Sequence, residues 1–375
     1  MGDRPPQPTG FPDWRVPGDL DTPCLVVDVD RMNANIERMT KRLSQVGVAL
    51  RPHAKTHKCV EVARAQLAGG AVGITTATLS EAEVFADAGI PDIFVAYPLW
   101  AVGAKAERLR RVAAKTRLRV GADSPEGVAL IGAAVNGGGA RPDVMIEVDA
   151  GELRTGVTTG ARAVEVATAA RAAGLRVAGI FTHGGHAYQG PAAAEPAAGD
   201  ELDATLTVLR ALTEAGFTDL EVSAGSTPTA LLSARDHVTE ERPGTFVFGD
   251  RQQAMLGSVA PSTVAAFVAG TCVSREAAGR FVLDCGGKAF TKDKPALLDG
   301  YGALPAYPQA RVTSMYDHHA VVEIGADGLG PGLGEVVAVV PNHICPVVNL
   351  YDQLLVMRDG AIVDRWPVAA RGCSQ

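Results

Sequence analysis

The chain has 375 residues, of which 47% are hydrophobic and 21% are charged, and its formal net charge is −7. This length suggests about two domains, although one α/β barrel alone can occupy roughly 250 residues. The acidic balance argues against nucleic acid or an anionic membrane as a partner. No apolar run approaches the ~20 residues needed to span a bilayer, and residues 1–8 contain no hydrophobic segment, so we expect a cytoplasmic protein. The six cysteines have no CxxC spacing, which argues against a disulfide framework and a structural zinc finger.

The first part of the chain alternates between short apolar strands and alanine-rich helices. Residues 1–20 are rich in proline and polar residues and predict an irregular arm. The first strand is expected at 23–28, and Asp30 caps a helix that runs to Leu43. The next strands are expected at 49–52, 73–76, 93–96, 118–121, 144–149, 177–183, 220–223 and 245–248. This alternation predicts a parallel sheet that is buried on both faces and closes as a (β/α)8 barrel over 21–252, with an open doubly wound sheet as the alternative.

The rhythm changes after about residue 253. The apolar runs become β-rich and are separated by turn signals such as Arg358-Asp-Gly360, with almost no helical pattern between them. They lie at 264–273, 279–284, 319–324, 335–340, 353–357 and 361–366. We therefore expect a second, mostly antiparallel β domain over 253–375.

One stretch, Arg51-Pro-His-Ala-Lys-Thr-His-Lys58, places a lysine between two histidines. If this segment ends a strand, His53, Lys55 and His57 share one face, because side chains alternate along an extended chain. A lysine amine crowded by other cations and partly desolvated is suited to forming a Schiff base. The alternative is a surface lysine beside two solvated histidines.

Two further motifs carry groups that bind anions or metals. Gly225-Ser-Thr-Pro-Thr229 lies between a strand and an apolar helical stretch, where backbone N–H groups and hydroxyls can hold a phosphate, or can simply cap the helix. With a strand-end lysine, it favours pyridoxal 5'-phosphate (PLP) as the cofactor. In Pro341-Asn-His-Ile-Cys-Pro346, His343 and Cys345 would point the same way from an extended segment and bind a metal such as zinc. A buried thiol beside a hydrogen-bonded histidine is the alternative for this motif.

Together these motifs resemble the D-serine dehydratase and D-threonine aldolase family of fold-type III PLP enzymes, whose N-terminal domain is similar to that of alanine racemase. The resemblance runs from residue 21 to residue 372. The segments that carry it are Pro52-His-Ala-Lys-Thr-His57, Gly225-Ser-Thr-Pro-Thr229 and Pro341-Asn-His-Ile-Cys-Pro-Val-Val-Asn-Leu350. It implies a homodimer.

The resemblance also implies roles for individual residues. Lys55 would form the Schiff base with the cofactor, and His183 would lie against the pyridine ring. The implied catalytic residues are Lys55 and His319. The implied cofactor contacts are His53, Lys55, Arg154, His183, Tyr188, Gly225, Ser226 and Thr227. The implied metal ligands are His343 and Cys345, with zinc as the expected ion and manganese as the alternative.

The implied activity is that of a PLP- and metal-dependent lyase acting on D-3-hydroxy amino acids. D-Serine dehydratase-type deamination to a 2-keto acid and ammonia is the first expectation, because the second metal ligand is a cysteine here and an aspartate in D-threonine aldolases. Retro-aldol cleavage to glycine and an aldehyde is the alternative, and an amino-acid racemase or a non-catalytic PLP carrier ranks below both. Where relatives tend to read Ser-Glu-Glu-His-Gly, this chain reads Tyr316-Asp-His-His-Ala320, so His319 matches, whereas Tyr316 and His318 do not. This departure leaves the β-substituent of the substrate open.

Overall fold

The computed structural model describes residues 6–324 and 328–375. The chain divides into two compact units. The barrel unit contains Arg38–Lys55, Val60–Gly244 and Gly372–Gln375, and the β unit contains the chain up to Glu37, Thr56–Cys59 and Thr245–Arg371. Each unit is built around a different sheet.

The barrel unit contains an eight-stranded sheet in which every neighbouring pair is parallel, in the order β2-β9-β8-β7-β6-β5-β4-β3. The strands are β2 (Ala49–Leu50), β3 (Ile74–Thr76), β4 (Asp92–Pro98), β5 (Arg117–Ala122), β6 (Asp143–Val148), β7 (Val177–Thr182), β8 (Glu221–Ala224) and β9 (Glu240–Glu241). A parallel bridge between His53 and Thr75 joins the two ends of this order. The expected (β/α)8 barrel is therefore confirmed.

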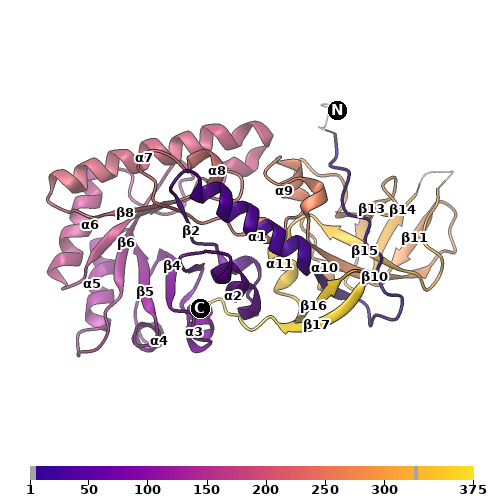
Figure 1. Cartoon of the computed structure of the whole chain (residues 1–375), viewed down its shortest axis with the longest axis horizontal. Helices are drawn as coiled ribbons and strands as arrows, with labels where there is room; N and C mark the ends of the chain where they lie inside the picture. Colours follow the sequence, from indigo (N-terminus) through magenta and orange to yellow (C-terminus); the bar gives the residue numbers. More distant parts are fainter. Residues whose placement is uncertain (1–5, 325–327) are drawn as a thin grey trace. The chain divides into compact units, whose positions relative to one another are not determined.

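Helices alternate with these strands and lie outside them (Figure 1). They are α2 (Val60–Ala68), α3 (Leu79–Asp87), α4 (Ala104–Ala113), α5 (Pro125–Ala134), α6 (Gly160–Ala172), α7 (Ala194–Glu214) and α8 (Ala230–Ser233). The side chains of Thr78, Ser124 and Thr159 cap α3, α5 and α6 by accepting backbone N–H groups of the first turn. These caps explain why the alanine-rich helices begin where they do.

The β unit contains a nine-stranded sheet with the path β13-β14-β11-β10-β1-β16-β17, and β15 pairs with both β10 and β12. Its strands are β1 (Cys24–Asp28), β10 (Ala266–Ser274), β11 (Arg280–Leu283), β12 (Gly302–Ala303), β13 (Arg311–Met315), β14 (Ala320–Glu323), β15 (Val336–Pro341), β16 (Gln353–Arg358) and β17 (Ala361–Pro367). All pairs except β1–β16 are antiparallel, as the turn-rich sequence predicted. The β unit also contains the short helices α9 (Arg251–Met255), α10 (Gly287–Phe290) and α11 (Ile344–Val348), and α1 (Val29–Ser44) follows β1.

Two strand predictions for the barrel were wrong. The strand at 23–28 exists as β1, but it pairs with β10 and β16 in the β unit, where Val26 opposes Phe267 and Leu355. An apolar run predicts a buried strand but does not indicate which strands pair with it. The sequence therefore assigned this strand to the sheet whose other strands follow it directly in the chain. The segment 245–248 is a 3-10 turn (Thr245–Val247), and the two-residue strand β9 takes the expected place in the sheet. Lys55 consequently follows the first barrel strand and not the second.

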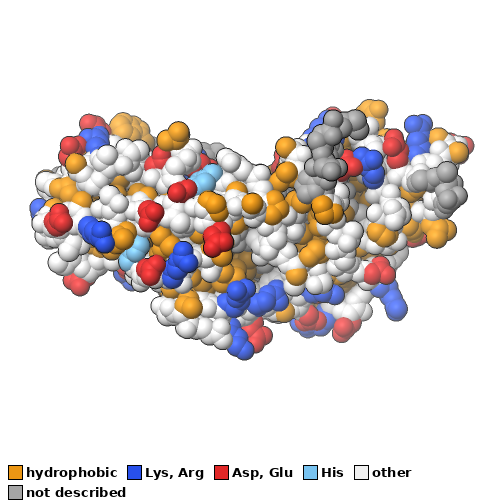
Figure 2. Space-filling model, turned by 90° about the horizontal axis from the view of Figure 1, so that it is seen from above, with side chains coloured by type: hydrophobic (Ala, Val, Ile, Leu, Met, Phe, Trp, Pro, Cys, Tyr) orange, Lys and Arg blue, Asp and Glu red, His pale blue; other side chains and the backbone are white. Residues whose placement is uncertain are grey.

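The surface is mixed in character. On the face shown in Figure 2, acidic and basic side chains are interspersed among apolar ones. No helix in the described ranges 6–324 and 328–375 combines the length and apolar character that a membrane span needs.

Candidate active site

Lys55 lies in a 3-10 turn, Ala54–Thr56, and not on a strand. His53 forms the bridge that closes the barrel, and its Nδ1 accepts the backbone N–H of Lys55 at 3.4 Å. His57 is buried, and its Nδ1 accepts the backbone N–H of Cys59 at 3.1 Å. The expectation that His53, Lys55 and His57 share one face of a strand was therefore wrong, because the chain turns immediately after the short β2. Lys55 itself is exposed.

His183, directly after β7, is where the predicted cofactor residues meet. Its ring hydrogen-bonds with the backbone of Gly225. Burial, together with the positive charges of Lys55, Arg154 and Arg242, lowers the pKa of His183 to about 3 against the opposing effect of that hydrogen bond. His183 is therefore neutral at physiological pH. The structure brings Lys55, Arg154 and Gly225 close enough to His183 for each to act on it.

The Gly225 turn follows β8 and has a shape that only glycine permits. Gly225 has φ +88°, and an added Cβ would lie 1.7 Å from Oε2 of Glu241. Its N–H donates to Oε1 of Glu201 at 3.2 Å, and the N–H of Ser226 donates to Oγ1 of Thr229 at 2.8 Å. Two N–H groups of the turn are thus engaged within the protein. The following helix α8 has only four residues, so its N-terminus is a weak site for an anion. The turn itself, with the buried Ser226 and Thr227, is the part suited to a phosphate.

Buried ionisable groups surround this turn. Burial raises the pKa of Glu241 well above its usual range, the negative charge of Glu201 raises it further, and burial also raises the pKa of Glu201. Arg242 is buried too and donates to Oγ of Ser223 at 2.6 Å and to the carbonyl of Thr182. Sequence reasoning missed Glu201, although a glutamate on the otherwise apolar face of α7 was a usable signal.

Three other side chains complete this region. Burial raises the pKa of Glu147, on β6, to about 7. Arg154 lies in the loop after β6, is largely exposed, and has Nη1 3.4 Å from Oε2 of Glu152. Tyr188 is half-buried in the 3-10 turn Gly185–Gln189, five residues after His183 in the chain.

The predicted metal pair lies in the β unit, after β15. His343 is the N-cap residue of α11 and Cys345 is in its first turn, so the expectation of an extended segment was wrong. The helical turn nevertheless brings the two side chains into hydrogen-bond contact. Cys345 Sγ also lies 3.3 Å from Oγ1 of Thr56, the residue after Lys55 in the chain.

The surroundings of His343 favour a cation. Nδ1 of His343 lies 3.5 Å from Oδ2 of Asp293. Burial lowers the pKa of His343, but Cys345, Asp250 and Asp293 outweigh it and raise the pKa to about 9. An imidazole and a thiol against two carboxylates fit a borderline-soft divalent ion. Within the described residues, no cluster of three or more His, Cys, Asp or Glu side chains is arranged to hold a metal.

His319 lies in the turn between β13 and β14. Its carbonyl accepts the N–H of Tyr316 at 2.8 Å, and both histidines of the turn, His318 and His319, are exposed. Gly286 packs against this turn, because an added Cβ there would lie 2.3 Å from the nitrogen of His319. The catalytic role of His319 stays a prediction.

Family models cover almost all of the chain. The alanine racemase N-terminal domain matches residues 27–252, and the "Putative serine dehydratase domain" matches residues 265–357. The chain belongs to the D-serine dehydratase and D-threonine aldolase family of fold-type III PLP enzymes. The family that the sequence resembled is therefore confirmed.

Individual relatives match over most of their length. The chain is 35% identical to a D-threonine aldolase of Arthrobacter sp. over 378 residues, which covers 99% of this chain and 97% of the relative. It is 36% identical to the D-threo-3-hydroxyaspartate dehydratase of Delftia sp. (strain HT23) over 352 residues, or 87% and 91%. The crystal structure of D-threonine aldolase from Filomicrobium marinum superposes with a TM-score of 0.88 at 32% identity, covering 97% of this chain and all of that one.

Solved structures of a D-threo-3-hydroxyaspartate dehydratase include two informative variants. One replaces a histidine by alanine, and another replaces a cysteine two positions further along by alanine and is described as the metal-free form. The spacing of these two residues is that of His343 and Cys345.

Proposed function

We propose that this protein is a PLP- and divalent-metal-dependent lyase that acts on D-3-hydroxy amino acids. The observation that carries the proposal is the convergence of Lys55, Arg154 and Gly225 on a neutral His183. When bound, PLP supplies an electron sink for negative charge at the substrate Cα. The membership of the chain in a family of PLP enzymes supports the same cofactor.

The side chains of the barrel divide the work of binding and proton transfer. Lys55 would hold the cofactor through its aldehyde group, and its free amine would take the proton from the substrate Cα. His183 would contact the cofactor without adding a positive charge, because its pKa is about 3. The turn Gly225, Ser226 and Thr227 would hold the phosphate.

Further contacts to the cofactor come from residues around this centre. In this proposal His53, Arg154 and Tyr188 complete the cofactor site. Arg154 is largely exposed in its loop, and His53 forms the bridge that closes the barrel. These assignments rest on the family resemblance together with the electrostatic contact of Arg154 with His183.

His343 and Cys345 would hold the metal, with Asp250 and Asp293 supplying the negative surroundings. Bound there, a divalent ion supplies a Lewis acid for the β-hydroxyl of the substrate. Zinc fits the nitrogen and sulfur donors, and manganese is the alternative. The metal-free cysteine variant of the dehydratase supports Cys345 as a ligand.

Dehydration is the reaction that we place first, with a 2-keto acid and ammonia as products. Its specific support is the cysteine of the metal pair, which the dehydratase of the metal-free structure also has. Retro-aldol cleavage to glycine and an aldehyde is the second candidate, because the Arthrobacter aldolase matches the chain over 99% of its length. A racemase needs no metal pair, and a PLP carrier needs no β unit, so both rank below. We also propose a homodimer, which sedimentation velocity would test.

The deciding experiment supplies D-serine, D-threonine and D-threo-phenylserine with zinc or manganese present. Keto acid is assayed against glycine plus aldehyde for each substrate. Keto acid as the main product supports dehydration, and glycine with an aldehyde makes the protein an aldolase. Absence of turnover on every D-amino acid, with retained PLP, would support the carrier, and inversion at Cα that persists in EDTA would support the racemase.

Cys345→Ala tests the metal pair. The variant should lose its bound metal and lower kcat/KM by about 10²-fold or more, because a Lewis acid supplies several kcal/mol to the transition state. The visible absorbance of bound PLP should remain, and elemental analysis measures the metal. Cys373→Ala is the matched control, since this half-buried cysteine belongs to the barrel unit and not to the β unit that contains the metal pair. Full activity and metal content in Cys345→Ala would remove the metal from the proposal.

A further inference from the structure

Glu201 in α7 joins the two turns of the barrel unit that would hold the cofactor. Its Oε1 accepts the backbone N–H of Gly184 at 2.7 Å and the backbone N–H of Gly225 at 3.2 Å. Gly184 follows His183 in the chain, and Gly225 begins the turn that is proposed for the phosphate. A single oxygen atom therefore sets the spacing between the turn after β7 and the turn after β8.

Glu201 also reaches the phosphate turn through Thr229. The side chain of Thr229 hydrogen-bonds with the carboxyl group of Glu201, and its Oγ1 accepts the backbone N–H of Ser226 at 2.8 Å. The hydroxyl oxygens of Thr229 and Ser226 lie 3.0 Å apart. The carboxyl group thus restrains Gly225 directly and Ser226 through one intervening side chain.

The side chain of Glu201 is tightly enclosed. It is completely buried, and an added Cβ at Gly184 would lie 3.0 Å from its carboxyl carbon. Its Oε2 is buried as well and has no hydrogen-bond partner in the described part of the chain. An apolar side chain at this position would avoid the cost of burying a carboxyl group. What the carboxyl group adds is the acceptor that holds the two turns.

We propose that Glu201 is a positioning residue that holds the phosphate turn 225–227 at a fixed distance from His183, so that the ring and the phosphate of PLP are bound at the same time. This inference rests on the proposed function, because it takes PLP as the cofactor. Glu201 acts through the backbone N–H groups of Gly184 and Gly225 and not by touching the cofactor. Loss of Glu201 should therefore weaken the binding of the phosphate group more than the binding of the ring.

The test compares PLP with pyridoxal, which has the same ring and aldehyde but lacks the phosphate. The dissociation constant of each compound is measured on the full-length protein by titration of the visible absorbance. Glu201→Met should weaken the affinity for PLP by about tenfold or more, because two buried N–H groups lose their acceptor and the turn is released. The affinity of the same variant for pyridoxal should stay within about threefold of that of the unmodified protein.

Two further variants separate the hydrogen bonds from the volume of the side chain. Glu201→Gln keeps an oxygen acceptor and should retain the affinity for PLP within about threefold. Glu201→Asp keeps the carboxyl group but is shorter by a methylene group, so it should lose affinity for PLP and not for pyridoxal. The aspartate variant also provides the test if Glu201→Met does not fold, which urea unfolding would show.

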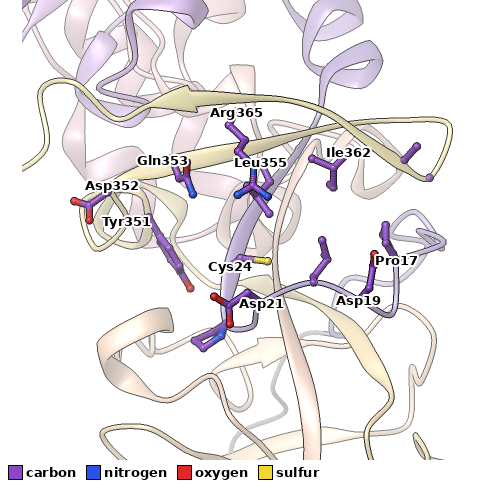
Figure 3. Close-up of a pocket in the computed structure, with 14 residues that line it drawn as sticks. Pro17, Asp19, Asp21, Cys24, Tyr351, Asp352, Gln353, Leu355, Ile362 and Arg365 are labelled. Carbon is purple, nitrogen blue, oxygen red and sulfur yellow. The ribbon is translucent and has the colours of Figure 1, made fainter.

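Two controls change an acidic residue outside the proposed cofactor site. Glu214→Met alters the exposed last residue of α7. Asp21→Asn removes a negative charge from the wall of a cavity of about 690 Å³ in the β unit (Figure 3), and the proposed cofactor residues are not among those that line this cavity. Both variants should bind PLP and pyridoxal as the unmodified protein does.

The outcomes separate this inference from the proposed function. Equal weakening of PLP and pyridoxal binding would mean that Glu201 only supports the fold, and unchanged PLP affinity in folded Glu201→Met or Glu201→Asp would equally overturn the inference. A loss in Glu201→Gln as large as that in Glu201→Met would also contradict it. If the unmodified protein binds neither compound, the proposed function fails as well, whereas a preference for PLP that persists in the variants defeats only the role of Glu201.

Discussion

Buried ionisable groups form ion pairs at one end of the barrel strands and have shifted pKa values at the other. At the N-terminal ends, Arg51 lies 2.7 Å from both Asp92 and Glu240, and Arg119 lies 3.1 Å from Glu221. At the C-terminal ends, Glu241 and Glu201 are buried with raised pKa values, and His183 is neutral with a lowered one. The first arrangement pairs its charges and the second neutralises them by shifting protons.

This difference separates stability from function in one fold. Removing one partner of a buried ion pair costs much free energy of unfolding, but the pair itself has no chemical role. Groups with shifted pKa values occur mostly where a ligand or a reaction uses them. The C-terminal ends of barrel strands are also where such folds carry their active sites. Substitutions at the N-terminal end should therefore affect unfolding, and substitutions at the C-terminal end should affect the cofactor and turnover.

Lys55→Ala should have the largest effect on activity. Removing the amine should lower kcat by about 10²–10⁴-fold or more and abolish the visible absorbance of bound PLP, because both the covalent bond and the proton acceptor are lost. The free energy of unfolding should change little, since the side chain is exposed. Lys41→Ala, at an exposed helical position, is the control. A variant that keeps its absorbance band after dialysis would show that another lysine holds the cofactor.

Arg51→Ala should have the largest effect on stability. It leaves the buried Glu240 and the half-buried Asp92 without the cation that lies closest to both, so the free energy of unfolding in urea should fall by about 3–5 kcal/mol. Arg117→Ala is the matched control, because this arginine is 52% exposed at the edge of the same network and should change stability by about 0–1 kcal/mol. Equal losses from the two variants would mean that the buried pair does not dominate this end.

Glu240→Gln should cost less, about 1.5–3 kcal/mol, because the amide keeps a hydrogen-bond acceptor but removes a charge from Arg51. Burial raises the pKa of Glu240, but Arg51, Ser223 and Arg119 outweigh it and lower the pKa. The stabilisation from Glu240 is therefore present above the unfolded pKa and is lost as pH falls through the folded pKa. Urea unfolding measured as a function of pH should show that the free energy of unfolding of the unmodified protein falls as Glu240 becomes protonated. The variant should not show this loss, and an equal loss in the variant would contradict the assignment.

Glu241→Gln, at the neighbouring residue of the same strand, should have the smallest effect. The pKa of Glu241 is raised in the folded protein, so folding favours its protonated form, which the amide resembles. The contribution of Glu241 is full below the unfolded pKa of about 4.5 and is lost as pH rises toward the folded pKa. The variant should match the unmodified protein near that lower pH and be more stable at higher pH. A loss above about 2 kcal/mol at low pH would show that Glu241 is ionised in the fold.

The sequence predicted the fold where apolar pattern and element length agreed. The barrel, its alanine-rich helices and the antiparallel β unit followed from alternation of strand and helix signals, and most expected strands lie within a few residues of the observed ones. Strand β9 could not be found in this way, because its two residues are buried glutamates. Their partners are distant in the chain or in the preceding helix: Arg51 and Ser223 bond to Glu240, and Ser233 bonds to Glu241. Strand β1 could not be assigned to its sheet, since its partners lie more than 200 residues away.

The site was predicted as a set of residues but not as a geometry. The sequence indicated Lys55, His183, Gly225, His343 and Cys345, yet two of the local conformations were wrong. A two-residue strand followed by a 3-10 turn and a five-residue helix leave almost no periodic signal. The buried carboxyl of Glu201 was missed although it lies on a largely apolar face of α7, and its bonds to the backbone N–H groups of Gly184 and Gly225 could not be deduced from a side-chain pattern.

The central claim is tested most directly by reducing the PLP-loaded protein with borohydride and mapping the modified peptide by mass spectrometry. Reduction fixes the cofactor to the amine that carries it. The pyridoxyl group should be found on Lys55 in the peptide that contains Pro52-His-Ala-Lys-Thr-His57. A cofactor attached to any other lysine, or no covalent adduct at all in a protein that has retained PLP, would contradict the account of this site.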